Sequence, residues 1–290
     1  MNEKDFFDYL SSFTNAEQCL SSFSNQKQFF RLNTLKVSLE NFKEFSKLSY
    51  LPTKYEFAFE LSESLEIGKT WEYFLGYIYP QSLPSIIDSI VLNPNKDDVV
   101  LDVAASPGSK FSHLAMLMEN RSVLVGNEVK KDKISALYST INRMNILNSI
   151  VTIRDGAKLD WKNRFTKVML DAPCTALGSG GSAIGRWEPD HSKRIAAIQK
   201  KMLFSAFDAL VPGGELVYST CTYAKEENEE VVKTLLDNVP SASLLDISVD
   251  FPHDRGLSDF GSEFSKCVRF YPQHLQSEGF FIAKIKKGDS

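Results

Sequence analysis

Short apolar runs alternate with amphipathic stretches from about residue 98 onward, and this alternation constrains the fold more than any other feature. The runs are rich in β-branched residues, as strands buried on both faces of a parallel sheet are. The stretches between them have the periodicity of helices. We therefore expect an α/β fold, a doubly wound Rossmann-like sheet with helices on both faces. The expected strands cover 98–104, 123–129, 150–153, 167–170, 215–219 and 279–286, and the expected helices 110–118, 131–144, 190–210 and 225–236.

The first 70 residues have a different character, since they are aromatic and Ser-rich and lack Gly-rich turns. A short polar motif at 31–36 precedes a helical pattern at 38–48. This order predicts a small N-terminal α+β appendage over residues 1–70, followed by the main domain over residues 71–290.

Composition excludes several classes of protein. The N-terminus is charged, and no apolar run reaches the roughly 20 residues that span a bilayer, so we expect a cytoplasmic protein without a membrane. The four cysteines are scattered singly, which argues against a structural metal site and, without export signals, against disulfides. The net charge of −4 does not favour a broad basic surface for nucleic acid. We expect a monomer that binds no metal.

Three expected strands end in residues suited to an adenosyl ligand. The loop over 104–110 is made of small residues that let backbone amides approach a ligand, and it lacks the glycines of a pyrophosphate-binding loop. Glu128 follows the second strand, where an acidic residue can bind two ribose hydroxyls. Asp155 follows the third strand and could accept from an adenine amino group. Because such sheets bind ligands beyond the carboxyl ends of their strands, these groups should share one crevice.

Two cysteines follow the next two strands. Asp171 and Cys174 end the fourth strand, and Cys221 ends the fifth, so two thiols and a carboxylate should meet at one rim. A thiolate that adds to carbon 6 of a cytosine makes carbon 5 nucleophilic enough to accept a methyl group. Asp171 could stabilise the charge that develops on the ring, and Lys110 could lower the pKa of the attacking thiol. Position alone does not say which thiol attacks.

The chain resembles the Sun (Fmu) family of RNA cytosine-5 methyltransferases over about residues 31–287, and most closely its bacterial ribosomal RNA enzymes. The motifs that carry this resemblance are RLNTLK (31–36), YPQSLPS (79–85), LDVAASPGSK (101–110), NE (127–128), LDAPCTALGSG (170–180), RWEPD (186–190), VPGGELVYSTCTYAKEENEEVV (211–232) and RFYPQHLQSEGFFIAK (269–284).

The resemblance implies roles for the candidate residues and S-adenosylmethionine as the cofactor. Cys221 would be the nucleophile and Cys174 the cysteine needed for product release, with Asp171 and Lys110 completing the catalytic set. Residues 71–290 would form the methyltransferase domain and residues 1–70 a small RNA-binding-like region. The implied cofactor-binding residues are Ala104, Ala105, Ser106, Pro107, Gly108, Ser109, Lys110, Glu128, Lys133, Asp155 and Asp171.

The expected partner is RNA, with ribosomal RNA favoured over transfer RNA. A non-catalytic RNA-binding assembly factor with a methyltransferase fold is the alternative from another class, and the retention of both cysteines and Asp171 argues against it. A DNA methyltransferase is disfavoured because its nucleophile normally occupies the position of Cys174. The acidic run over 226–230 is interpreted as the start of a helix with a solvated face.

Overall fold

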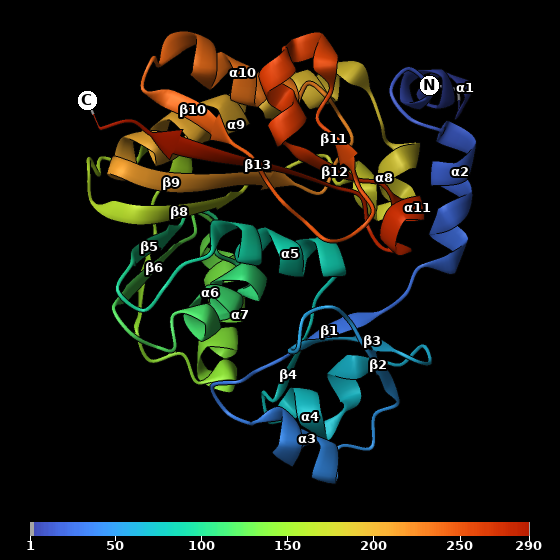
Figure 1. Cartoon of the computed structure of the whole chain (residues 1–290), viewed down its shortest axis with the longest axis vertical. Coiled ribbons are helices and arrows are strands. Elements are labelled where there is room, and N and C mark those ends of the chain that lie inside the picture. Colours follow the sequence, from blue (N-terminus) through green and yellow to red (C-terminus); the bar gives the residue numbers. More distant parts are fainter. Residues whose placement is uncertain (1–2, 290) are drawn as a thin grey trace.

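A computed structural model describes residues 3–289, and its main body is a nine-stranded sheet with helices on both faces (Figure 1). Its strands are β5 (Val99–Asp102), β6 (Val123–Asn127), β7 (Ser149–Thr152), β8 (Phe165–Asp171), β9 (Leu210–Thr220), β10 (Ala242–Leu245), β11 (Asp254–Arg255), β12 (Val268–Phe270) and β13 (Phe280–Lys287). They lie in the order β11-β12-β13-β9-β8-β5-β6-β7, with β10 also paired to β13. Strands β5 to β9 pair in parallel, whereas β13 is antiparallel to β9. The doubly wound α/β sheet is confirmed.

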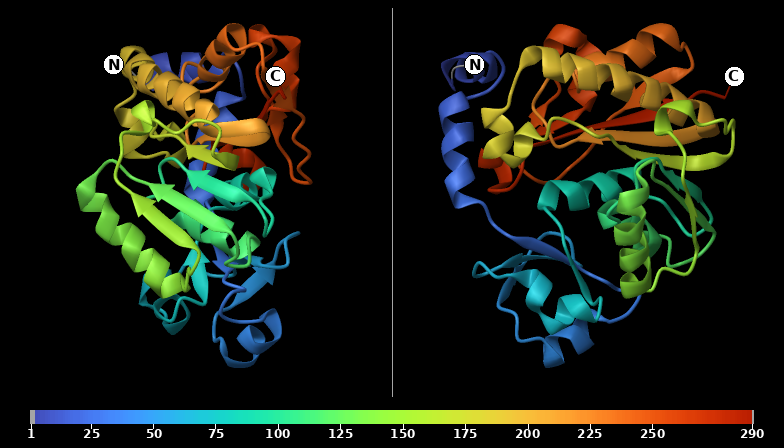
Figure 2. Two further views of the ribbon diagram at one scale, coloured as in Figure 1. Left: turned by 90° about the vertical axis from the view of Figure 1, so that its left-hand side faces the viewer. Right: turned by 180° about the vertical axis from the view of Figure 1, so that it is seen from behind.

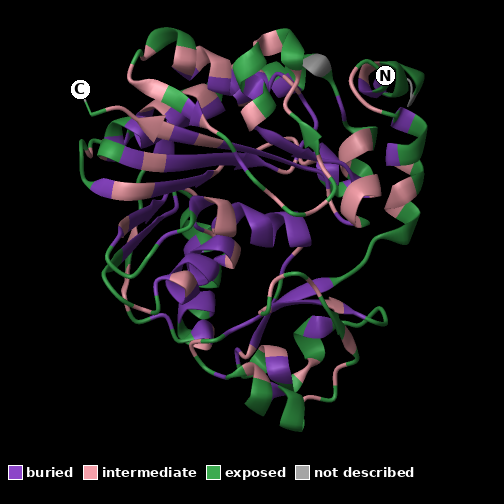
Figure 3. Ribbon diagram, in the orientation of Figure 1, coloured by how far each residue is buried: buried purple, intermediate pink, exposed green. Residues whose placement is uncertain are grey.

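Two helix layers cover the two faces of this sheet, as the two views of Figure 2 show. One layer consists of α9 (Pro189–Ala209) and α10 (Glu229–Asn238); the other consists of α5 (Leu83–Leu92), α6 (Ser109–Leu117) and α7 (Lys131–Met144). Successive side chains of a strand point to opposite faces. Leu101 therefore belongs to the core cluster under the first layer and Val100 to the cluster under the second. The central strands are buried along most of their length (Figure 3).

A second, smaller sheet lies at the lower end of the molecule in Figure 1. Its strands are β1 (Phe29–Leu32), β2 (Tyr50–Pro52), β3 (Ala58–Leu61) and β4 (Ile78–Pro80), all antiparallel, and it carries α3 (Leu39–Phe45) and α4 (Trp71–Phe74). Since β4 follows residue 70, this sheet extends beyond the expected appendage. Arg31 of β1 is fully buried and donates a hydrogen bond to Ser112 of α6 over 2.7 Å, which fastens the small sheet to the large one.

The N-terminal helices α1 (Glu3–Ser11) and α2 (Ala16–Ser21) do not pack in the small sheet. They lie at the side of the main body beside α8 (Ser182–Gly185) and α11 (Pro272–Leu275) (Figure 1). Phe6 packs edge-on against Trp187 with ring centroids 5.2 Å apart, and the Tyr9 hydroxyl donates to Glu226. The first helices therefore cover the edge of the main body that carries Trp187.

Two C-terminal strands differ from the expectation. β9 begins at Leu210 rather than at 215, because Leu210 already pairs with Phe165 before the chain bulges out over 211–214. The Pro-Gly-Gly sequence forms this bulge, in which Gly213 has a φ of +76°. β13 begins at Phe280 rather than at 279, and its first four residues are buried because it lies between β9 and β12.

The acidic run does contain the start of a helix, but the prediction of a solvated face was wrong. α10 begins at Glu229 instead of at 225, and Glu227, Asn228 and Glu229 are completely buried. Their side chains point into the protein because each has a partner there: Glu229 forms an ion pair with Arg269, and the other two hold segments near the cysteines.

Among residues 3–289, no helix combines the length and the apolar character needed to cross a membrane.

Candidate active site

A cavity of about 340 Å³ opens at the carboxyl ends of the parallel strands, where the sequence places its polar loops. It collects residues that end β5, β6, β8 and β9 and one from the loop after β7, as expected for a doubly wound sheet. Its lining comprises Val103, Ala104, Ser106, Asn127, Glu128, Val129, Lys130, Lys133, Asp155, Gly156, Asp171, Ala172, Pro173, Cys174, Ala176, Ile198, Met202 and Cys221.

The cavity contains groups of the kind that an adenosyl ligand needs. The Glu128 and Asp155 carboxylates both line it, and they are the predicted acceptors for a ribose diol and an exocyclic amino group. Ile198 and Met202 of α9 supply an apolar wall for a flat ring. Two acceptors beside an apolar wall fit S-adenosylmethionine, and these residues would hold it.

The loop between β5 and α6 depends on Gly108. This residue has a φ of +106°, and a Cβ at its position would lie 2.7 Å from Cγ2 of Thr140 on α7. The Thr140 hydroxyl donates to the Pro107 carbonyl over 2.7 Å, and Ser106 donates to the Lys133 carbonyl over 2.8 Å. The loop is thus tied to α7, which fixes the start of α6 beside the cavity.

The predicted cofactor residues divide into two groups. Ala104, Ser106, Glu128, Lys133, Asp155 and Asp171 line the cavity, whereas Ala105, Pro107, Gly108, Ser109 and Lys110 lie behind it. Ala105 is buried in the core beside Phe111, and Gly108 supports the loop through its packing on α7. Roles in cofactor binding stay predictions for all of them.

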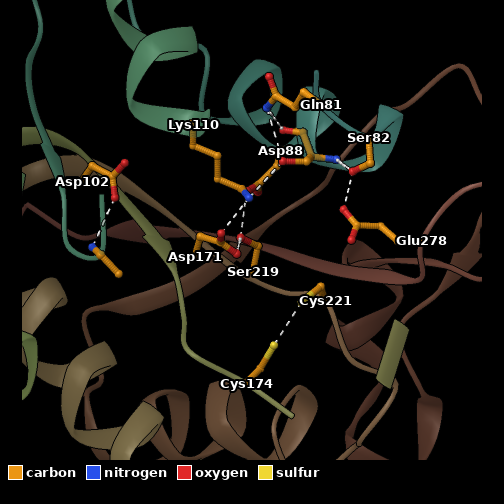
Figure 4. Close-up of polar contacts among 12 residues, drawn as sticks. Gln81, Ser82, Asp88, Asp102, Lys110, Asp171, Cys174, Ser219, Cys221 and Glu278 are labelled. Atoms are coloured by element: carbon orange, nitrogen blue, oxygen red, sulfur yellow. Dashed lines mark hydrogen bonds and ion pairs between the residues drawn. The ribbon is translucent and has the colours of Figure 1, made fainter. Parts of the chain in front are cut away.

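A buried charge network lies behind the carboxyl end of β8 (Figure 4). The Lys110 ammonium is 2.7 Å from Asp171 Oδ2, 3.9 Å from Asp88 Oδ2, and donates to Ser85 Oγ over 3.0 Å. Burial alone would lower the pKa of Lys110, but the Asp171 and Asp88 carboxylates outweigh burial and raise it. Lys110 is therefore a fixed cation that orients Asp171 at the rim of the cavity.

Asp88 completes this network, although only a weak signal in the sequence distinguishes it. It lies in the apolar helix α5, is fully buried, and accepts a hydrogen bond from Ser219 Oγ over 2.8 Å. Burial raises the pKa of Asp88 to about 7 although Lys110 counteracts it. A lone Asp among the apolar residues of a helix was the available signal.

The two predicted cysteines face each other in the same cavity. Cys174 Sγ and Cys221 Sγ are 3.3 Å apart, and both residues are half-buried (Figure 4). The hydrogen bond with Cys221 and then burial raise the pKa of Cys174 well above its usual value. Two sulfurs at this distance share a proton more readily than they carry two negative charges.

Two residues missed by sequence reasoning hold the cysteine segments. Glu227 accepts the backbone N–H of Thr175 over 3.0 Å, and Asn228 donates to the carbonyl of Thr222 over 3.0 Å. Each therefore fixes the residue that directly follows a cysteine. The acidic run contained them, but only their long-range contacts distinguish them from surface carboxylates.

Within residues 3–289, no cluster of three or more His, Cys, Asp or Glu side chains could hold a metal ion. The polar groups of this site are arranged for proton and nucleophile chemistry.

Comparison with known proteins relates the chain to RNA-modifying enzymes. Residues 89–286 match the family described as 16S rRNA methyltransferase RsmB/F. The tRNA (cytosine(49)-C(5))-methyltransferase of Pyrococcus abyssi is 36% identical over 271 residues, which cover 89% of this chain and 87% of that protein. The ribosomal RNA small subunit methyltransferase F of Cronobacter sakazakii is 34% identical over 278 residues, which cover 90% of this chain but 57% of that protein. The chain thus spans little more than half the length of this ribosomal RNA relative.

A solved structure shares the whole fold. The structure of NSun6 from Pyrococcus horikoshii with SFG, an analogue of S-adenosylmethionine, superposes with a TM-score of 0.87. The two sequences are 24% identical, and the match covers 97% of each chain. This likeness supports the Rossmann-like methyltransferase fold.

Proposed function

The chain belongs to the RsmB/F family of 16S rRNA methyltransferases, and on that premise we propose that it methylates carbon 5 of a cytosine in ribosomal RNA through a covalent bond to Cys221. Members of this family depend on S-adenosylmethionine. The observation that carries the proposal is the pair of sulfurs 3.3 Å apart in the cavity that also contains Glu128 and Asp155.

The residues of the site account for the steps of this reaction. The Cys221 thiolate forms a bond to carbon 6 of the cytosine, and the electron pair of the ring double bond moves toward carbon 5 and the ring carbonyl. Asp171, held by Lys110, can accept a hydrogen bond from ring nitrogen 3 once that nitrogen takes up a proton as negative charge develops on it. The bound cofactor supplies an electrophilic methyl group.

Release reverses the addition. The proton on carbon 5 must leave, and its electrons re-form the ring double bond as the bond between carbon 6 and Cys221 breaks. Cys174 Sγ lies 3.3 Å from the Cys221 sulfur and can assist this elimination. Its removal should therefore trap the enzyme on the RNA.

Transfer RNA is the second candidate substrate, and one observation favours it. The chain covers 87% of the Pyrococcus abyssi transfer RNA enzyme but 57% of the ribosomal RNA enzyme. In either RNA the target base must leave its stack to reach a cavity of this depth.

The RNA-binding role of residues 1–70 also belongs to this proposal. Phe45 on α3 is 46% exposed, and Lys43 and Lys47, two residues before and after it in the chain, are exposed as well. An exposed ring can stack a base, and exposed cations of the same segment can attract a phosphate. The enzyme would act as a monomer on one local RNA structure.

A trapping experiment tests the mechanism. The Cys174→Ala protein is incubated with cofactor and, separately, with small-subunit ribosomal RNA and bulk transfer RNA, and covalent protein–RNA adducts are resolved on denaturing gels. We expect an adduct with ribosomal RNA that disappears when Cys221→Ala is added.

The alternatives predict different outcomes. An adduct with transfer RNA alone would move the substrate to that class. If wild-type protein transfers no methyl group to either RNA and no adduct forms, the protein is a binding factor rather than an enzyme. Bisulfite sequencing of the methylated RNA then locates the modified cytosine.

A further inference from the structure

Two thiols that are chemically alike must perform different tasks in this site. Their sulfurs are 3.3 Å apart, so a second negative charge beside the first is unfavourable, and the pair ionises one thiol at a time. The remaining thiol then donates its proton to the thiolate. The surroundings decide which sulfur holds the charge.

A buried carboxylate is attached to the Cys174 side. Glu227 is completely buried and accepts three hydrogen bonds: from Thr175 N–H over 3.0 Å, from Thr175 Oγ1 over 2.5 Å and from Gln199 Nε2 over 3.0 Å. The amide groups can only donate, which fits an ionised carboxylate. Burial raises the pKa of Glu227, and the hydrogen bonds from Thr175 and Gln199 counteract this effect.

A neutral group occupies the equivalent place on the Cys221 side. Asn228 accepts a hydrogen bond from Thr220 Oγ1 over 2.6 Å and donates to the Thr222 carbonyl over 3.0 Å, so it holds the residues on both sides of Cys221. The two consecutive residues Glu227 and Asn228 thus hold the two cysteine segments, one with a charge and one without.

Other charged groups face the two sulfurs, but they do not favour protonation of Cys174 over protonation of Cys221 in the same way. Asp171 is paired with Lys110, so their fields largely cancel. Arg186, Glu188 and His191 line a second cavity that adjoins Cys174, and all three are exposed, where solvent and salt screen their fields. Glu227 is the buried charge tied to the residue next to Cys174.

We propose that Glu227 assigns the two roles: its charge keeps the proton on Cys174 and leaves Cys221 as the thiolate that attacks. Glu227 is a positioning residue, because it contacts Thr175 and acts on the sulfurs through its field. The hydrogen bond with Cys221, burial and the Glu227 charge all raise the pKa of Cys174, and the contribution of Glu227 has the sign that this assignment requires. The inference rests on the proposed function for its biological meaning, but the distribution of the proton is a property of the RNA-free protein.

Alkylation of the full-length protein without RNA measures this distribution. A thiolate displaces iodide from iodoacetamide, and peptide mass spectrometry reports the rates at Cys174 and Cys221 separately across a pH series. We expect Cys221 to react first in the wild type. In Glu227→Gln the ratio of the Cys221 rate to the Cys174 rate should fall about tenfold, which corresponds to one unit of pKa difference.

Two variants control for a general structural effect. Glu230→Gln removes a half-buried carboxylate three residues later on α10 and should leave the ratio unchanged. Glu227→Asp keeps the charge and should restore most of the preference for Cys221. Equal ratios in Glu227→Gln and Glu230→Gln would overturn the proposal.

A second measurement covers the case in which Glu227→Gln does not fold. The pH dependence of alkylation is recorded for the single remaining thiol in Cys174→Ser and in Cys221→Ser. Cys221 should titrate at lower pH than Cys174, and the reverse order would overturn the proposal. Absence of RNA methylation in a protein that shows the expected order would refute the proposed function and leave this assignment standing.

Discussion

The buried ion pair between Glu229 and Arg269 should be essential to stability. Arg269 Nε donates to Glu229 Oε1 over 2.7 Å and its NH2 group contacts Oε2, so the pair is bidentate. The Glu229 side chain is 0% exposed and the Arg269 side chain 2% exposed. Burial alone would lower the pKa of Arg269, but the Glu229 carboxylate outweighs it and raises the pKa. We predict that Glu229→Gln strongly destabilises the protein.

The size of the loss follows from what the substitution leaves behind. A glutamine amide presents one donor to the guanidinium donors and removes the compensating charge, so Arg269 stays ionised and buried. Breaking a buried pair in this way costs about 3–5 kcal/mol, out of the roughly 5–15 kcal/mol that a typical domain has. Glu229 Oε1 also accepts the backbone N–H of Leu257 over 3.1 Å, and the glutamine oxygen can keep this bond, so the loss comes from the Arg269 side of the pair.

Urea unfolding at neutral pH measures the free energy of unfolding of the wild type and the variant. The control is the double variant Glu229→Met with Arg269→Met, which removes both charges and keeps most of the volume. We expect it to be about 2 kcal/mol more stable than Glu229→Gln, because replacement of a whole buried pair is far cheaper than removal of one partner. A loss below about 1 kcal/mol in Glu229→Gln would refute the reasoning, since it would be the loss typical of an exposed pair.

Three further predictions concern the site. Burial raises the pKa of Asp88 from about 3.9 in the unfolded chain to about 7. The unfolded state therefore loses this proton first, and the free energy of unfolding falls as the pH rises from about 4 to 7. Asp88→Asn should flatten this fall in a pH series of urea unfolding. Gly108→Ala puts a Cβ 2.7 Å from Thr140 Cγ2 at a residue with a positive φ. We expect it to lower the melting temperature by an amount equivalent to more than about 1 kcal/mol and to weaken cofactor binding in calorimetry. Gly68→Ala, which meets no atom within 4 Å, should change neither quantity. Glu128→Ala should weaken binding of S-adenosylmethionine at least about tenfold by the same method while leaving the melting temperature of the ligand-free protein close to that of the wild type; unchanged affinity would remove Glu128 from the ribose site.

The sequence predicts the large sheet because its signals are local. A β-branched run followed by small or turn residues marks each parallel strand, and the helix over 131–144 matches the observed α7. Ligand binding at the carboxyl ends of strands then brings Glu128, Asp155, Cys174 and Cys221 to one cavity. The prediction that the two thiols meet needed only the positions of the strand ends and no side-chain contacts.

The remaining contacts could not be predicted because they depend on residues far apart in the chain. The composition of the acidic run is typical of a solvated surface. Its residues are buried because their partners are distant in the chain: Glu227 pairs with Thr175, 52 positions earlier, and Glu229 with Arg269, 40 positions later. Asp88 reaches Ser219 across 131 positions. The small sheet contains strands of three and four residues, too short to give a clear periodic signal.

The position of β13 has a consequence for how the protein forms during synthesis. Strand β13 is the last strand in the described chain, yet it lies inside the sheet between β9 and β12 and also carries β10. Strands β5 to β9 can pair with one another as they leave the ribosome, but β10 and the β11–β12 pair have no place in the sheet until residues 280–287 emerge. Until that moment β9, which leads to Cys221, is an unprotected edge open to pairing with other chains. Completion of the reactive end of the molecule thus waits until β13 has been synthesised.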